Sequence, residues 1–267
     1  MNIGPQEKRS SKALLLIDTT IVGVTVGIVR CDQSFSSQSK DAQPYLAAHE
    51  GHYDNAGSIA LISTLTERCL REASLHPNDV QGIVISTGPG SFTGIKIGLA
   101  FAQGWACGLE HTTLWLGVSA LEHAVNFRGR EGCLTLFLPA TRTHGFVVER
   151  HSGSTKSARL IDISSWDKNI CRFAHDPLEL SASNNIEIVG TWPLLEKILQ
   201  DHGSNFRTQS PKDVARDAVQ SMADHAAMKW PKAFSPTIPG PNYLRLSTAE
   251  EQLAQRAAVV RRPEETQ

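Results

Sequence analysis

The chain has no apolar run long enough to cross a membrane, and its net charge is close to zero. A transmembrane helix needs about 20 consecutive apolar residues, and no stretch of the 267 residues is that apolar. The 26 lysines and arginines are balanced by 27 aspartates and glutamates, so the formal net charge is −1. Proteins that bind nucleic acid unaided usually carry a marked basic excess. The sequence therefore predicts neither a membrane protein nor a strong, independent nucleic-acid binder.

The sequence also lacks the cysteine pairs of a disulfide or zinc framework. It has five cysteines, an odd number, and no CxxC pair. Free thiols in a reducing compartment are expected. The first 12 residues, MNIGPQEKRSSK, contain no apolar segment of the kind found in secretory signals, so they predict a loose tail and a cytoplasmic location. The cysteines are Cys31, Cys69, Cys107, Cys133 and Cys171.

Residues 82–109, GIVISTGPGSFTGIKIGLAFAQGWACGL, form the most distinctive stretch. A short apolar strand at 83–85 precedes a glycine-rich loop at 88–94, and an apolar helix follows. Strand, tight loop and helix N-terminus form an arrangement that can bind phosphate through backbone N–H groups. The loop is not a Walker A motif, because Gly94 is followed by Ile95 and Lys96. Alternatively, the glycines serve backbone geometry alone. The candidate phosphate contacts in the loop are Gly88, Gly90, Ser91, Thr93 and Gly94.

The helix after this loop carries small residues at every fourth position. Each interior glycine costs a helix about 1 kcal/mol relative to alanine, so tight packing must compensate. Two explanations remain open: close packing inside this chain, or a helix interface with another subunit. Gly104 and Gly108 lie on another part of the helix surface. The stripe consists of Gly94, Gly98, Ala102 and Ala106.

Near the start of the chain, a strand at 13–17 and an alternating strand at 22–30 flank an acidic turn. This turn contains Asp18 and Thr19. ATPases of the actin–hexokinase type hold nucleotide phosphates and metal at such a turn, although a lone aspartate is also common in ordinary turns. Residues 32–57 are polar and predict irregular structure. Within them, His49 and His52 have a spacing compatible with metal binding, but no further ligands follow at a recognisable spacing.

The later chain alternates predicted helices and strands and repeats its first hairpin. Helices are expected at 58–73 and 119–127, and strands at 113–118, 134–138, 146–148, 159–163 and 186–189. The hairpin around residue 140 matches the first at an offset of 120, with Leu14/Leu134, Leu16/Leu136 and Arg30/Arg150 identical. Such a repeat is typical of an internally duplicated α/β protein. Thr191 is the predicted N-cap of one helix, and Ser210-Pro211 the predicted start of another.

Four segments together resemble the TsaB (YeaZ) family of glycoprotease-like proteins, which act in bacterial tRNA threonylcarbamoyladenosine biosynthesis. They are LLLIDTT at 14–20, ISTGPGSFTGIKIGLAFAQGWA at 85–106, GVSALEHA at 117–124 and PNYLR at 241–245. The resemblance is dense over 82–127 and thin over 150–235.

The resemblance implies an α/β fold of the actin-like ATPase (ASKHA) class, with two related lobes. Each lobe has a mixed sheet and flanking helices. The expected organisation is a loose tail at 1–12, a first lobe at 13–110, a second lobe at 111–245 and a charged tail at 246–267. The resemblance also implies work with TsaD and TsaE, which place a threonylcarbamoyl group on the adenosine beside the anticodon of tRNAs reading ANN codons.

Two departures, one from the catalytic relative TsaD and one from the family's usual second hairpin, argue against independent catalysis. TsaD holds its metal with two histidines spaced H-x-x-x-H after a Gly-Val turn. Alignment on Gly117-Val118 puts Ala120 and Ala124 at those positions, with His123 one residue away. The second hairpin has Pro139-Ala140-Thr141 where a D-A-R-type turn is usual. We therefore expect this chain alone to bind no metal and no cofactor, with ATP and a divalent metal on the TsaD partner.

The first hypothesis is a non-catalytic scaffold that activates TsaD and contacts tRNA only through the complex. The resemblance implies that the helices at 58–73 and 94–109 make the contact, and that the isolated chain forms a homodimer through the same surface. In this view, Gly98→Leu or Ala102→Leu abolishes TsaD binding and leaves the fold intact. The expected interface residues are Ile59, Ile62, Leu65, Gly94, Gly98, Ala102 and Ala106.

The alternative hypothesis is a small-molecule ATPase of the actin–hexokinase type that acts alone. Asp18, Thr19 and the 88–94 loop would then carry the phosphate contacts. A protease is not supported by the sequence, because Ser91 has no G-x-S-x-G setting and no histidine that can be paired with it.

Overall fold

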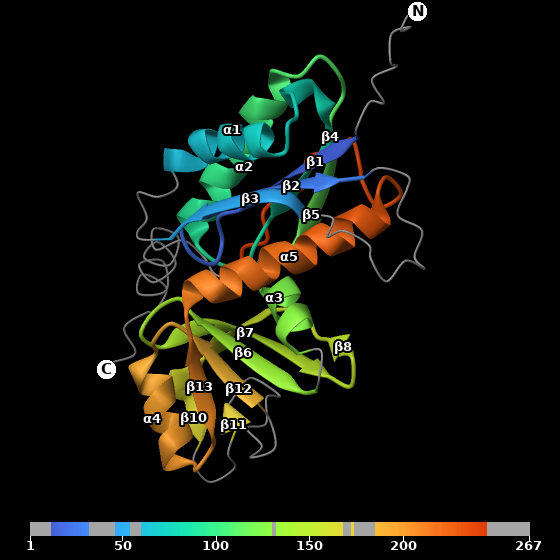
Figure 1. Cartoon of the computed structure of the whole chain (residues 1–267). Helices are drawn as coiled ribbons and strands as arrows, with labels where there is room; N and C mark the ends of the chain where they lie inside the picture. Colours follow the sequence, from blue (N-terminus) through green and yellow to red (C-terminus); the bar gives the residue numbers. More distant parts are fainter. Residues whose placement is uncertain are drawn as a thin grey trace, which may run out of the picture.

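The computed structural model describes residues 12–31, 46–53, 60–129, 132–167, 172–173 and 185–244. Within these residues, a five-stranded and a six-stranded sheet form the centres of two lobes (Figure 1). The strands are β1 Ala13–Asp18, β2 Val24–Arg30, β3 Leu46–His52, β4 Val80–Ser86, β5 Leu114–Val118, β6 Leu134–Pro139, β7 His144–His151, β8 Ser154–Thr155, β9 Arg159–Asp162, β12 Asn185–Val189 and β13 Phe206–Gln209. A separate short hairpin pairs β10 Trp166–Asp167 with β11 Arg172–Phe173. The α-helices are α1 Ile62–Glu72, α2 Phe92–Cys107, α3 Ala120–Arg128, α4 Pro193–Asp201 and α5 Pro211–Lys229.

The two sheets share one topology, which confirms the predicted duplication and the actin-like ATPase fold class. The first sheet has the order β3-β2-β1-β4-β5, and the second places β9, β7, β6, β12 and β13 in the matching positions. In each sheet the hairpin is antiparallel, β1 with β2 and β6 with β7. The next two strands are parallel to the hairpin's first strand, β4 and β5 in one lobe and β12 and β13 in the other.

The elements stack in layers (Figure 1). Helices α1 and α2 cover one face of the first sheet, α5 and α3 lie between the two sheets, and α4 covers the outer face of the second. Strand β1, ALLLID, is buried along its whole length because helices cover both of its faces. A central strand between two helical layers needs apolar residues on both sides, which explains the continuous apolar run.

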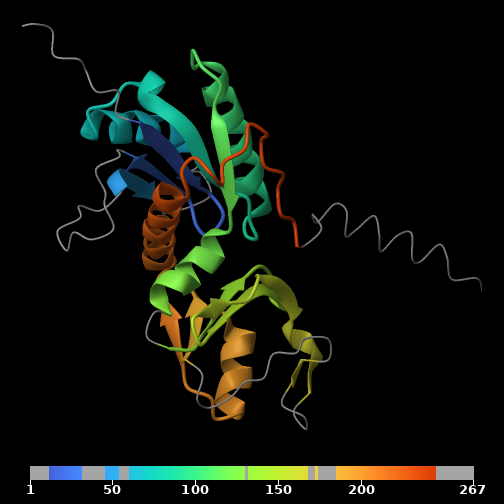
Figure 2. The ribbon, with the colours of Figure 1, turned by 90° about the vertical axis from the view of Figure 1, so that its right-hand side faces the viewer.

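The C-terminal part of the chain returns to the first lobe. Helix α5 packs against α3 and also against β1 and β2. Beyond α5, Ser235 exchanges two backbone hydrogen bonds with Trp115 of β5 at 2.7 and 2.9 Å, and the Asn242 N–H donates to Thr87 O at 2.8 Å. Figure 2 shows this segment running beside β5 and α2. β5 itself follows residue 110, the expected end of the first lobe, yet it pairs with β4 in the first sheet.

Several local expectations need correction. Residues 46–52 are not irregular but form edge strand β3, whose mixed polar sequence fits a strand with a single buried residue, Ala48. The helix expected from 58 begins at Ile62, with Leu61 at the N-cap position. Trp192 and not Thr191 is the N-cap of α4, and its N–H donates to Glu196 Oε1 at 2.7 Å. Ser210 does precede Pro211 at the start of α5, as predicted.

Candidate functional site

Asp18 ends β1 at the first hairpin turn and is fully buried. Its Oδ1 accepts hydrogen bonds from the Thr20 N–H at 3.0 Å and from Thr20 Oγ1 at 2.7 Å. Its Oδ2 has no hydrogen-bond partner among the described residues. Burial raises the pKa of the carboxyl group above its ordinary value, and the bonds from Thr20 only partly offset this. One oxygen of Asp18 thus shapes the turn through Thr20, whereas burial disfavours the charged form of the carboxyl group.

The glycine loop packs directly against that turn. The Ser91 N–H donates to Thr20 O at 2.8 Å, and Thr19 Oγ1 donates to Gly94 O at 2.8 Å. A Cβ on Gly90 would lie 2.2 Å from Thr20 O, and a Cβ on Gly94 would lie 1.9 Å from Thr19 O. Real Cβ atoms do not come that close to other atoms. The turn and the loop are therefore in direct backbone contact, and the glycines permit this close approach.

At the start of α2, a backbone N–H group is likewise bonded within the chain. Ser91 is the N-cap, and its Oγ accepts the Gly94 N–H at 3.1 Å. Gly88 has a φ of +110°, a left-handed conformation that favours glycine. Of the two alternatives for the loop, these contacts favour backbone geometry over phosphate binding. Thr93 is exposed on α2, while Thr19 is buried beneath the helix.

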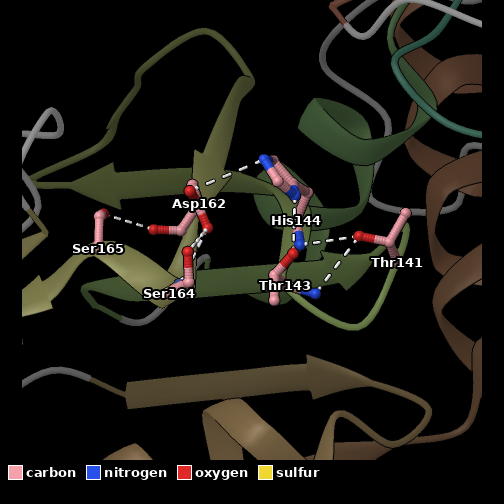
Figure 3. A network of polar contacts seen from close by, with 6 residues as sticks. All are labelled: Thr141, Thr143, His144, Asp162, Ser164 and Ser165. Carbon is pink, nitrogen blue, oxygen red and sulfur yellow. Dashed lines mark hydrogen bonds and ion pairs between the residues drawn. The ribbon is translucent and has the colours of Figure 1, made fainter. Parts of the chain in front are cut away.

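The backbone N–H groups of the second hairpin turn also donate to acceptors within the turn (Figure 3). Thr141 Oγ1 accepts the N–H groups of His144 at 3.0 Å and Thr143 at 3.4 Å. The N–H groups of Ala140 and Thr141 both donate to His144 O. These four donors are consumed within the turn, so they do not form an anion site.

A hydroxyl and an imidazole of this turn lie near a carboxylate at the end of the neighbouring strand β9 (Figure 3). Thr143 Oγ1 lies 2.9 Å from His144 Nδ1, while His144 Nε2 lies 3.9 Å from Asp162 Oδ2. The second distance is too long for a hydrogen bond. Asp162 Oδ1 instead accepts the Ser164 N–H and Oγ–H at 2.9 and 2.6 Å. Thr143, His144 and Asp162 therefore lack the continuous chain of hydrogen bonds that activates a hydroxyl nucleophile. They give no support to a protease.

A cavity of about 310 Å³ lies between the two turns. None of its lining side chains, all from the described residues, carries a charge that could neutralise a phosphate. Its wall combines uncharged polar groups with aromatic and aliphatic side chains from both lobes. The lining residues are Thr20, Ile21, Gly90, Ser91, Phe92, Ile95, Leu138, Pro139, Ala140, Phe146, Asn242, Tyr243 and Leu244.

The positions expected to have lost metal ligands lie in the core of the helix layer. Ala120 and Ala124 are fully buried in α3. His123 faces α5, where its Nδ1 lies 3.0 Å from Ser221 Oγ and its ring packs edge-on against His225 at 5.1 Å. Burial, with a smaller contribution from His225, lowers the pKa of His123 to about 4. Within the described residues, no three His, Cys, Asp or Glu side chains gather as metal ligands would.

The small-residue stripe turns inward, which corrects the expected partner interface. Gly94, Gly98 and Ala102 are buried in this chain, and a Cβ on Gly98 would lie 2.4 Å from Thr19 Oγ1. Ile62 and Leu65 of α1 are buried as well. Ala106 is partly buried, and Ile59 lies outside the described residues. The stripe thus serves close packing inside the chain, and Gly98→Leu would damage the fold.

A different face of α2 is exposed, and the interface predicted from the sequence does not include it. Ile97, Ala100, Gly104 and Cys107 are all exposed, and a Cβ on Gly104 would meet no atom within 4 Å. The only charged residue of α2 is Lys96, whose ammonium lies 4.1 Å from the Phe92 ring centre. Apart from Lys96, this exposed side of α2 carries no charge, which is unusual for a surface helix. In the sequence, the second set of glycines, Gly104 and Gly108, marks this exposed face of α2.

Comparison with known proteins identifies the family. The family model for TsaD, tRNA N6-adenosine threonylcarbamoyltransferase, matches residues 58–261, which is more than half of the chain. Two curated tRNA N6-adenosine threonylcarbamoyltransferases match over shorter stretches. The protein from Ehrlichia canis (strain Jake) is 29% identical over 102 residues, 37% of this chain and 29% of its own length. The protein from Chlorobium chlorochromatii (strain CaD3) is 30% identical over 100 residues, 38% of this chain and 25% of its own length.

Solved structures agree on the fold. YeaZ from Pseudomonas aeruginosa superposes with a TM-score of 0.60 at 16% identity, covering 87% of this chain and 100% of that chain. A second Pseudomonas aeruginosa structure, described as similar to peptidase YEAZ, gives 0.58 at 17% identity, covering 88% and 100%. The expected resemblance to TsaB (YeaZ) is thus confirmed at the level of the fold. Among the described residues, no helix is long and apolar enough to cross a membrane. The chain belongs to the family of TsaD, tRNA N6-adenosine threonylcarbamoyltransferase, and it has the fold of the YeaZ proteins.

Proposed function

We propose that this chain is a non-catalytic partner and activator of a TsaD-type protein. Together with TsaE, the two proteins would form N6-threonylcarbamoyladenosine beside the anticodon of tRNAs reading ANN codons. ATP, the divalent metal and the tRNA would be bound by the complex and not by this chain alone. Membership of the TsaD family and the YeaZ-like fold support a role in this pathway.

The observation that carries the proposal is the direct contact between the first turn and the glycine loop. Backbone atoms of Thr19 and Thr20 lie against Gly90 and Gly94, and the cavity beside this contact is lined by no charged side chain that could neutralise a phosphate. The second turn keeps its N–H groups for internal hydrogen bonds. These features argue against the alternative of an ATPase that acts alone, since charge stabilisation by oriented donors dominates phosphoryl transfer.

The partner surface we propose is the exposed face of α2. Ile97, Ala100, Gly104 and Cys107 present small or apolar side chains without charge, and their spacing places them along one side of the helix. Small residues let a second helix approach closely, and aliphatic residues gain from being removed from water. The same face would pair two copies of the chain when the TsaD-type protein is absent, which fits the isologous geometry of homodimers.

Gly104→Arg is the sharpest test of this surface. The position is open to solvent, so arginine fits the isolated chain and blocks the approach of a second helix. Binding to the TsaD-type protein of the same organism, measured by calorimetry, is expected to weaken at least 100-fold. Gln200→Arg on the exposed side of α4 introduces the same side chain elsewhere and should bind like wild type.

The dimer gives a second readout of the same surface. Sedimentation of the purified chain should show a dimer for wild type and for Gln200→Arg, and a monomer for Gly104→Arg. Unchanged binding and unchanged dimerisation of Gly104→Arg would place the interface elsewhere and refute the proposed surface.

A further inference from the structure

Arg128 joins elements of both lobes at their junction. It lies in the last turn of α3, between the two sheets. Its Nε donates to Glu187 Oε2 of β12 at 2.8 Å, and its Nη1 donates to Asp217 Oδ2 of α5. The side chains of Arg128, Glu187 and Asp217 are 16%, 13% and 19% exposed. β12 belongs to the second sheet, whereas α5 packs on the first.

We infer that this interlobe ion-pair network (Arg128, Glu187 and Asp217) fixes the orientation of the two lobes, so that they do not close on a ligand. One guanidinium group holds a carboxylate from each side of the junction. Arginine suits this role because its planar group donates in several fixed directions at once. The inference concerns the lobes alone and does not depend on the proposed partner.

The remaining contacts at the junction leave little room for adjustment. Helices α3 and α5 pack through small buried residues, among them Ala120, Ala124 and Ala218. His123 of α3 also contacts Ser221 of α5. Domain closure generally needs a few loop or end residues that absorb a change in backbone angles. Here the two lobes meet through packed helices and a mostly buried ion-pair network.

Removal of the Arg128 guanidinium group should allow the two lobes to move relative to each other. Mostly buried ion pairs are screened less than surface pairs, and removal of one partner leaves the other charges uncompensated. Without the guanidinium group, Glu187 and Asp217 would repel each other and move toward water. Movement of Asp217 shifts α5, whereas movement of Glu187 shifts the second sheet.

Hydrogen–deuterium exchange on the full chain tests the inference. Arg128→Met keeps an aliphatic stem and removes the donors. Amides of α3 are expected to exchange at least 10-fold faster in this variant, while β1 and β4 stay protected as in wild type. Small-angle X-ray scattering should show a larger maximum dimension. Arg216→Met removes an exposed ion pair with Asp213 on the same helix, so it should leave both measurements unchanged.

A triple variant separates the network from the effect of stranded charges. Arg128→Met/Glu187→Gln/Asp217→Asn removes all three charges, and its α3 exchange and scattering should still differ from wild type. Wild-type behaviour of the triple variant would show that helix packing alone fixes the lobes and would overturn the inference. Unchanged α3 exchange in Arg128→Met would overturn it too. An equal acceleration in β1 and β4 would assign the network to global stability and would likewise reject a role in lobe orientation.

Discussion

Gly98 of α2 lies against Thr19 of the first hairpin turn, so closely that a Cβ on Gly98 would stand 2.4 Å from Thr19 Oγ1. The hydroxyl group of Thr19 is held in place by its bond to Gly94 O at 2.8 Å. This relationship explains why a helix with several glycines is stable in this chain. It also separates two sets of glycines on one helix, one needed for the fold and one free at the surface.

Gly98→Ala and Gly104→Ala form a matched pair that tests this separation. Gly98→Ala forces Thr19 to move and should lower the free energy of unfolding by about 1–3 kcal/mol, the usual cost of overpacking. Gly104→Ala meets no neighbouring atom and should raise it by up to about 1 kcal/mol through helix propensity. Urea denaturation measures both. Equal effects at the two positions would contradict the contact between α2 and the turn.

The sequence alone leaves two explanations open for Gly98, close packing inside the chain or a partner interface, and the scaffold hypothesis placed it at the interface. The repeat of small residues every four positions correctly identified a closely packed face of α2. It could not identify what packs there, because that neighbour is Thr19, 79 positions earlier (98 − 19). The duplication was predictable, since two strands with the same pattern recur at a fixed offset. Strand β3 was not, because an edge strand with polar residues shows no regular alternation.

The candidate site was likewise predictable in part from the sequence. The acidic turn and the glycine loop were correctly expected to lie together, as both follow parallel strands of one sheet. Their direct contact depends on backbone atoms of Thr19 and Thr20 and leaves no pattern in the sequence. The exposed face of α2 did leave one, in Gly104 and Gly108. Only the burial of the other stripe shows which face is available to a partner.

Asp18→Asn should change how stability depends on pH. Burial raises the pKa of Asp18 above its ordinary value of 3.8 in the folded chain. A carboxyl group of this kind contributes stability below the unfolded pKa, and that contribution is lost as pH rises through the folded pKa. Wild type should therefore lose stability relative to Asp18→Asn as pH rises from 3.8 toward neutral. If the difference in free energy of unfolding between wild type and Asp18→Asn stays constant across this range, the pKa of Asp18 is not raised in the folded chain.

His123 should destabilise the chain in acid. Its pKa is lowered from 6.5 to about 4 in the folded chain, so folding favours the neutral ring. The contribution of the neutral His123 ring to the free energy of unfolding is fully present above pH 6.5 and is lost as pH falls through about 4. The full loss is on the order of 3 kcal/mol, at about 1.36 kcal/mol for each unit of pKa shift.

His123→Gln keeps a polar group near Ser221 and removes the titration. Its thermal stability should vary less between pH 7 and pH 4 than that of wild type. His151, a partly exposed histidine of the second lobe, gives the control variant His151→Gln, which leaves the junction between α3 and α5 untouched. A steep acid loss that persists in His123→Gln would assign the titration to other groups.

Reconstitution of the tRNA modification tests the central claim most directly. The TsaD-type and TsaE-type proteins of the same organism are supplied with the activated threonylcarbamoyl donor and tRNA, and modified adenosine is measured with and without this chain. We predict that modification requires this chain, survives Asp18→Asn and is lost with Gly104→Arg. We also predict no ATP hydrolysis by the chain alone. Full modification without the chain, or ATP hydrolysis by the isolated chain that disappears in Asp18→Asn, would contradict the account.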